Sequence, residues 1–229
     1  MAADDDVVGR ERELATIDGF IDAQPGAPAV LLVDGEAGIG KTTLWRAAAQ
    51  RARIRGHRVL DAAPAEAERE LPFSALGDLL GGVIASVMDR LPPPQARALK
   101  VALLLEDEGS RAPDQRAVAL AVLSALRLLS AEGPVLIAID DARWLDAASG
   151  DVLRYAVRRL RGEPIRLLLL SRGTDPSAEY AELDTALPPR SVHRLPVESL
   201  SVAGIGRLMR IRLEAQFSRP DLELSLIHI

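Results

Sequence analysis

Apolar and polar residues fall into two alternating kinds of segment along the chain. Five short runs rich in apolar residues are expected to be strands, because strands of a parallel sheet are buried on both faces. They cover 29–34, 57–62, 135–139, 165–170 and 191–195. Between these runs, apolar residues recur every three or four positions, as in helices that bury one face. The alternation predicts an α/β fold.

The helical spacing is expected over 10–23, 43–55, 73–88, 95–105, 114–130 and 147–160. Asp114 and Asp146 precede the last two of these segments, and aspartate is a favourable residue for capping a helix N-terminus. Gly56 follows the second segment and is placed to end it. Two polar stretches, 64–71 and 106–113, are expected to be surface loops.

The text GEAGIGKT at 35–42 matches the phosphate-loop pattern GxxxxGK[ST]. It lies between a predicted strand and a predicted helix, which is the context this motif requires. Glycines let successive N–H groups turn inward on an anion, and the helix N-terminus adds partial positive charge. Lys41 is expected to reach the β- and γ-phosphates, and Thr42 to ligate Mg²⁺. A glycine turn without a ligand is the alternative, which the agreement of motif and context disfavours.

The expected phosphate-binding residues are Gly35, Glu36, Ala37, Gly38, Ile39, Gly40, Lys41, Thr42 and Thr43.

A second motif follows the apolar run 135–139, which ends in Asp140 and Asp141. This is the form of a Walker B strand, and open α/β sheets bind ligands at the carboxyl ends of their strands. We expect Asp140 to hold Mg²⁺ through its water shell. Asp141 is expected to orient or deprotonate the attacking water. A solvated acidic turn is the alternative.

Other polar residues carry weaker signals. Arg172 follows the run 165–170 and is expected to contact a γ-phosphate, although a solvated loop residue is the alternative. The three histidines stand apart and the chain has no cysteine, so no zinc-ligand spacing is present. The basic runs 51–55 and 158–161 are interpreted as solvated helix ends.

The amino-acid composition narrows the range of possible functions. Of 28 basic residues only Lys41 and Lys100 are lysines, and a compact ammonium suits a position among phosphates. The chain has no asparagine, which excludes an NKxD guanine-reading motif. A net charge of −5 argues against nucleic-acid binding by the chain as a whole. The acidic start, the lack of cysteine and the interrupted apolar stretch 117–139 predict a cytoplasmic protein without a membrane span.

Five segments occur in a familiar order: VGRE at 8–11, GEAGIGKT at 35–42, AIDDARWLD at 138–146, LLLLSRG at 167–173 and LPVESLS at 195–201. Together they resemble the nucleotide-binding domain of the STAND branch of AAA-type P-loop ATPases. They are most similar to the large ATP-binding LuxR-type transcriptional regulators of bacteria. The resemblance covers roughly 6–213.

The resemblance implies the roles already given to the lysine, the threonine and the two acids. It also places Val8 and Gly9 beside the adenine and makes Arg172 the sensor arginine. The family's usual text is DDxQWxD, and here Arg143 replaces the glutamine. Any contact that this glutamine makes is therefore in question.

The expected fold is a three-layer P-loop NTPase with a five-stranded parallel sheet, in which one strand separates the Walker B strand from the phosphate-loop strand. We divide the chain into an N-terminal strap and helix (1–24), an ATPase core (25–196), the truncated start of a helical lid (197–223) and a tail (224–229). The tail reads like translated transposase-end sequence and is expected to be non-native. The rest of the lid, the winged helix, the sensor repeats and the DNA-reading helix-turn-helix are not in this sequence.

The expected function is binding of ATP with Mg²⁺ and slow hydrolysis, used as a switch. The ADP state would close the lid, and the ATP state would favour an open form that self-associates. DNA would be contacted only through the missing C-terminal domain, and no membrane partner is expected. Two alternatives stay open. One is a small-molecule kinase, which should carry an arginine-rich lid; no such segment is evident, and only 106–113 stays open for that role. The other is a nucleotide-binding module that never hydrolyses ATP, an alternative that the shortness of Asp141 relative to glutamate keeps open.

Overall fold

The computed structural model describes residues 7–23, 28–107, 113–172 and 183–213. The side chains of Arg172, Asp184 and residues 211–213 lie outside that description. So do the predicted tail 224–229, the last part of the predicted lid and most of the loop 106–113.

Five parallel strands form one sheet in the order β2-β3-β4-β1-β5. They are β1 (Ala29–Gly35), β2 (Arg58–Ala62), β3 (Val135–Ile139), β4 (Ile165–Arg172) and β5 (Val192–Pro196). The predicted fold class is confirmed, and β4 is the strand that separates β1 from β3. The carboxyl ends of parallel strands share one edge, so the segments after β1, β3 and β4 meet there.

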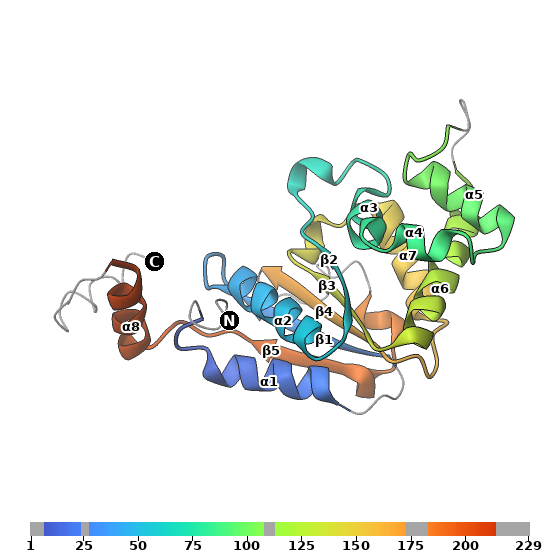
Figure 1. The fold of residues 1–229 in the computed structure, drawn as a ribbon. Coiled ribbons are helices and arrows are strands. Elements are labelled where there is room, and N and C mark those ends of the chain that lie inside the picture. Colours follow the sequence, from blue (N-terminus) through green and yellow to red (C-terminus); the bar gives the residue numbers. More distant parts are fainter. Residues whose placement is uncertain (1–6, 24–27, 108–112, 173–182, 214–229) are drawn as a thin grey trace.

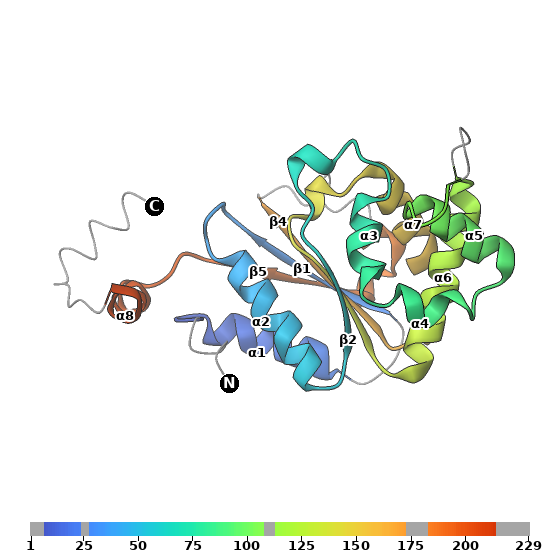
Figure 2. The same ribbon diagram turned by 45° about the horizontal axis from the view of Figure 1, so that its top comes forward.

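Helices cover both faces of the sheet, which makes three layers (Figures 1 and 2). The helices are α1 (Glu11–Asp22), α2 (Lys41–Ile54), α3 (Ser74–Gly81), α4 (Ile84–Met88), α5 (Pro93–Ala102), α6 (Gln115–Glu132), α7 (Ala147–Val157) and α8 (Val202–Leu213). The helices α1 and α2 lie on one face, and α3 to α7 lie on the other. The last helix, α8, lies apart from these layers, beyond the turn that joins β1 to α2.

The alternation of side chains along β1 divides the core into two clusters. Val30 and Leu32 face the helices α3 to α7, whereas Leu31 and Val33 face α1 and α2. All four side chains are at most 1% exposed. Both faces of the strand are apolar because both are covered, as the continuous apolar run predicted.

The single helix predicted over 73–88 is wrong, since the structure divides this segment into α3 and α4. Gly81 and Gly82 lie at the break, and glycine is a poor helix former. The apolar spacing continues across the break because Leu80 and Val87, one on each helix, pack into the same cluster. The apolar spacing therefore predicted correctly which side chains are buried, but it did not reveal that the helix is interrupted.

The predicted helix signals are confirmed at three positions. Asp114 accepts hydrogen bonds from the amides of Arg116 (2.9 Å) and Ala117 (3.2 Å) at the start of α6. The carboxylate of Asp146 caps α7. Gly56 follows the end of α2 with a φ of +80°, a left-handed conformation that glycine adopts without strain.

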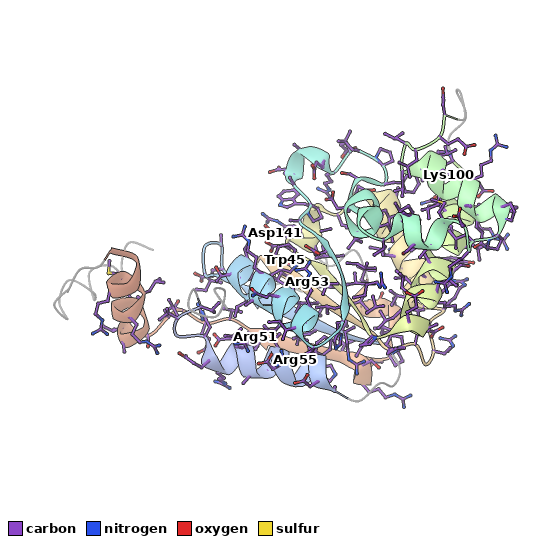
Figure 3. The ribbon with its side chains drawn as sticks, in the orientation of Figure 1. Trp45, Arg51, Arg53, Arg55, Lys100 and Asp141 are labelled. Carbon is purple, nitrogen blue, oxygen red and sulfur yellow. The ribbon has the colours of Figure 1, made fainter. Side chains whose placement is uncertain are left out.

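The basic run at the end of α2 is more than a solvated helix end (Figure 3). Arg51 forms an ion pair with Asp18 of α1, and Arg55 contacts the same carboxylate at 2.9 Å. Arg53 lies 2.5 Å from Asp61 of β2. These pairs connect α2 to its neighbours, and sequence order alone could not place the carboxylates.

Within the described part of the chain, no helix is both long and apolar enough to span a membrane.

Candidate nucleotide site

The loop between β1 and α2 depends on two glycines with left-handed backbones. Gly38 has a φ of +77° and Gly40 a φ of +102°, angles that strain any residue with a Cβ. Gly40 directly precedes α2, so the loop ends at a helix N-terminus. The first amides of a helix have no partner within the helix, and they carry partial positive charge. The loop is thus built to receive an anion.

Lys41 is buried beside the loop, with 6% of its surface exposed. Its Nζ donates hydrogen bonds to the carbonyl oxygens of Gly35 (2.6 Å) and Glu36 (2.7 Å). These bonds hold the ammonium inside the loop that the sequence predicts to bind phosphates. Lys100, the other lysine, lies on α5, far from the loop (Figure 3).

Thr42 and Asp140 meet across the site. The Oγ1 of Thr42 donates a hydrogen bond of 2.7 Å to Oδ2 of Asp140, although the two residues are 98 positions apart in sequence. Mg²⁺ prefers oxygen ligands, and it is held through few carboxylates together with substrate phosphates. A hydroxyl and a carboxylate at this spacing beside a phosphate-type loop fit such an ion.

Asp140 is 8% exposed, and burial is the main cause that raises the pKa of its carboxyl group above the usual range. The negative charge of Asp141 raises the pKa further. The hydrogen bond from Thr42 and the positive charge of Lys41 act in the opposite direction, because both favour the ionised form. A divalent cation bound here would supply the missing positive charge.

Asp141 occupies the turn between β3 and the short 3-10 helix Ala142–Trp144. Its φ of +49° lies in the left-handed region, which aspartate tolerates better than most residues. The turn leaves its carboxylate half-buried at the same edge of the sheet as the phosphate loop, near α2 (Figure 3). Asp140 and Asp141 are thus adjacent in sequence but differ in backbone conformation and burial.

The other predicted site residues lie around this edge. The backbone of Arg172 pairs with Gly35 in the register of β4 and β1, so it lies beside the start of the loop. Its side chain is outside the described residues. Val8 is buried, and Gly9 has a φ of +72°. A Cβ on Gly9 would lie 3.0 Å from Cδ2 of Leu200, so the N-terminal strap packs against the segment that leads to α8.

Sequence reasoning missed a second role of Asp146. Its carboxylate is 2% exposed and accepts hydrogen bonds from the amides of Ser149 (2.8 Å), Phe73 (2.9 Å) and Ala75 (3.2 Å). It therefore holds the start of α3 as well as that of α7. No local signal could reveal this, because two of the amides belong to a segment about 70 residues earlier in the chain.

Arg143, which replaces the glutamine of the resembling motif, packs against the residue that follows it. The guanidinium carbon of Arg143 lies 4.4 Å from the ring centroid of Trp144, within the range of a cation–π contact. Its Nε is buried without a hydrogen-bond partner in the described part of the chain. Arginine at this position is therefore packed on its neighbour.

Residues 6–170 match the family described as the AAA ATPase domain. The chain belongs to this family. A curated relative, an uncharacterized protein of Rhizobium meliloti (strain 1021), is 30% identical over 221 residues. That match covers 84% of this chain and 21% of the relative, so the chain spans about a fifth of the relative's length.

Solved structures at low sequence identity share the fold of this AAA ATPase domain. The ORC2 protein of Aeropyrum pernix in ADPNP-ADP complexes has a TM-score of 0.55 and 17% identity, over 96% of this chain and 57% of that chain. AMPPCP-bound DnaA of Aquifex aeolicus has a TM-score of 0.51 and 12% identity, over 95% and 56%. A STAND protein of Pyrococcus horikoshii with a tetratricopeptide repeat sensor has a TM-score of 0.50 and 15% identity, over 96% and 27%.

Domains of this family generally bind and hydrolyse ATP, with Mg²⁺ as the accompanying ion.

Proposed function

We propose that this AAA ATPase domain binds ATP and Mg²⁺ at the loop 35–42, hydrolyses ATP slowly and acts as the nucleotide switch of a bacterial LuxR-type transcriptional regulator. The observation that carries the proposal is the hydrogen bond from Thr42 to Asp140. This bond brings together the phosphate loop and the end of the Walker B strand, the two motifs that a P-loop ATPase needs around one Mg²⁺ ion.

Each residue has a definite task in this proposal. The loop amides and Lys41 hold the phosphates, and Thr42 and Asp140 hold the metal and its water ligands. When bound, Mg²⁺ neutralises charge that develops on the phosphate oxygens. Asp141 orients the attacking water and accepts its proton. Outside this group, Arg172 contacts the γ-phosphate, and Val8 and Gly9 line the adenine.

Slow turnover follows from the length of the side chain at 141. Aspartate is one methylene shorter than glutamate, so its carboxylate reaches less far toward an attacking water. Small misplacements of a catalytic group reduce rates strongly. The same shortness favours the second candidate, a nucleotide-binding module that does not hydrolyse ATP.

The regulatory part of the proposal rests on the five sequence motifs and on the likeness of the fold to a STAND protein. In this reading, ADP closes the lid that begins at α8, and ATP opens it so that copies self-associate. A ligand shifts such an equilibrium only through contacts that differ between the two states. Contact with DNA would belong to a further domain outside this chain.

Single-turnover hydrolysis tests the function and separates it from the non-hydrolysing module. The parent chain is expected to convert bound ATP to ADP slowly, and Asp141→Asn to be slower by about 100-fold or more, as when a general base is lost. Nucleotide affinity should stay within about twofold, since asparagine also tolerates the left-handed backbone. Equal rates in both proteins would remove Asp141 from the mechanism, and no turnover in the parent would favour the binding module.

A further inference from the structure

Arg10 joins three parts of the chain that are far apart in sequence. Its side chain is 6% exposed. Its Nη1 donates to Oε1 of Glu13 (2.7 Å) and to the carbonyl oxygen of Glu198 (2.6 Å). Its Nη2 donates to the carbonyl oxygen of Ile39, at 2.7 Å. A planar guanidinium with five N–H groups can hold three acceptors in a fixed geometry, and a flexible ammonium cannot do so as well.

The contact with Ile39 fixes one peptide unit of the phosphate loop. In a trans peptide the C=O and the following N–H point in opposite directions. No cis peptide occurs in the described ranges of the chain. With the carbonyl of Ile39 directed at Arg10, the amide of Gly40 points away from Arg10. If the loop binds nucleotide as proposed, this amide is one of those available to the phosphates.

The contact with Glu198 fixes the segment that leads to α8. The preceding residue, Val197, donates its amide to the carbonyl oxygen of Asp34 at 2.7 Å, at the end of β1. On the other side, a Cβ at Gly9 would lie 3.0 Å from Leu200 and 3.4 Å from Cα of Gly204. The strap residues before α1 therefore touch both the phosphate loop and the base of α8.

We propose that Arg10 is the positioning residue that couples nucleotide occupancy of the loop to the attachment of α8. A phosphate that accepts a bond from Gly40 N–H polarises the shared peptide and strengthens the bond between its carbonyl and Arg10. The same guanidinium holds Glu198, so a bound nucleotide stiffens the base of α8. This inference rests on the proposed nucleotide site, and it identifies Arg10 as the link between that site and the lid that begins at α8.

Hydrogen exchange of the 229-residue chain, followed by mass spectrometry with and without saturating MgATP, tests the coupling. In the parent, nucleotide is expected to slow exchange of the amides in 197–206 by about tenfold, the scale of one charge-assisted hydrogen bond. Arg10→Lys keeps the charge but cannot hold both carbonyls. It should reduce this effect below about twofold while nucleotide affinity stays within about tenfold of the parent.

Two further variants complete the design. Glu11→Gln removes an exposed contact of 3.2 Å between Glu11 and Arg207, which also joins the strap to α8 but does not touch the loop. It should respond to nucleotide like the parent. Glu13→Gln is a milder change that weakens the contact holding the guanidinium of Arg10. It should lose part of the nucleotide-dependent protection of 197–206, and it serves as the test if Arg10→Lys does not fold.

The outcomes separate the two proposals. Parent-like protection in both Arg10→Lys and Glu13→Gln overturns the role of Arg10, as does a loss in Glu11→Gln equal to that in Arg10→Lys. If the parent binds nucleotide but shows no change in 197–206, the coupling fails and the proposed nucleotide binding stands. If the parent binds no nucleotide, both fail.

Discussion

The hydroxyl of Thr42 on α2 donates a hydrogen bond of 2.7 Å to the carboxylate of Asp140 at the end of β3. Both oxygens are ligands of the kind that Mg²⁺ takes, and both side chains are positioned by the same sheet edge. Thr42→Val keeps the shape of the side chain and removes the hydroxyl. The variant is expected to bind MgATP about tenfold or more weakly, and to lose most of the difference between binding with and without Mg²⁺. Equilibrium titration with a fluorescent ATP analogue measures both.

The matched control for that experiment is Thr16→Val. Thr16 lies on the exposed face of α1, where its hydroxyl donates a hydrogen bond to the carbonyl of Arg12 in its own helix. Its substitution should leave the Mg²⁺ dependence unchanged. A Thr42→Val variant that behaves like this control would show that the hydroxyl takes no part in metal binding.

The raised pKa of Asp140 predicts a stability effect with a definite sign. Burial disfavours the ionised form, so the folded state binds a proton more tightly than the unfolded state does. The ionised carboxylate therefore destabilises the metal-free protein above its raised pKa, and this penalty disappears as pH falls toward the unfolded value. Asp140→Asn removes the charge. It should raise the melting temperature at neutral pH by about 2–4 °C for each kcal/mol gained, with a gain that shrinks toward pH 4.

Thermal melts of the metal-free protein between pH 4 and pH 8 measure this effect. A lower melting temperature for Asp140→Asn at neutral pH would mean that the ionised carboxylate is stabilised by its surroundings, contrary to the burial argument. The same variant should bind Mg²⁺ poorly, because an amide is a weaker ligand than a carboxylate.

Asp146 is expected to contribute more to stability than an ordinary helix cap. Asp146→Ala leaves three buried amides without an acceptor, on Phe73, Ala75 and Ser149. We expect a loss of about 3 kcal/mol or more in the free energy of unfolding, from the cost of unsatisfied buried donors. The comparison is Asp114→Ala, an exposed cap, with an expected loss of about 1 kcal/mol. Equal losses in urea unfolding would contradict the role of Asp146 in holding α3.

The close approach of Val197 to the phosphate loop predicts the effect of adding one carbon at Gly35. A Cβ there would lie 3.1 Å from both Cγ2 of Ile39 and the carbonyl oxygen of Val197. Gly35→Ala should destabilise the protein by about 1–3 kcal/mol through overpacking. Gly77→Ala in α3 adds the same carbon where nothing lies within 4 Å, and it should stabilise the helix by up to about 1 kcal/mol. Urea unfolding measures both variants, and changes of the same sign in their free energies of unfolding would contradict this reasoning.

The sequence predicted the elements of the site that are local. The phosphate loop is a continuous motif, and its glycines require the positive φ angles observed at Gly38 and Gly40. The two acids of the second motif end a strand whose apolar run was unambiguous. The prediction that one strand separates β3 from β1 came from family resemblance, since apolar runs identify strands without ordering them.

The sequence could not predict contacts between distant segments. Nothing near Arg10 indicates that its guanidinium holds carbonyls of Ile39 and Glu198, because backbone acceptors have no sequence signature. The second role of Asp146 was hidden for the same reason. The break between α3 and α4 was missed because the apolar spacing reports which face is buried, and two helices can share one buried face.

The central claim is that the loop 35–42 binds ATP with Mg²⁺ through Lys41, and calorimetric titration of the 229-residue chain tests it most directly. The account predicts Mg²⁺-dependent binding in the parent and in Lys100→Ala, whose substituted lysine lies on α5. Lys41→Ala, which removes the buried ammonium held by Gly35 and Glu36, should bind about 100-fold more weakly or not measurably. Binding of MgATP by a folded Lys41→Ala variant with parent affinity would contradict the account.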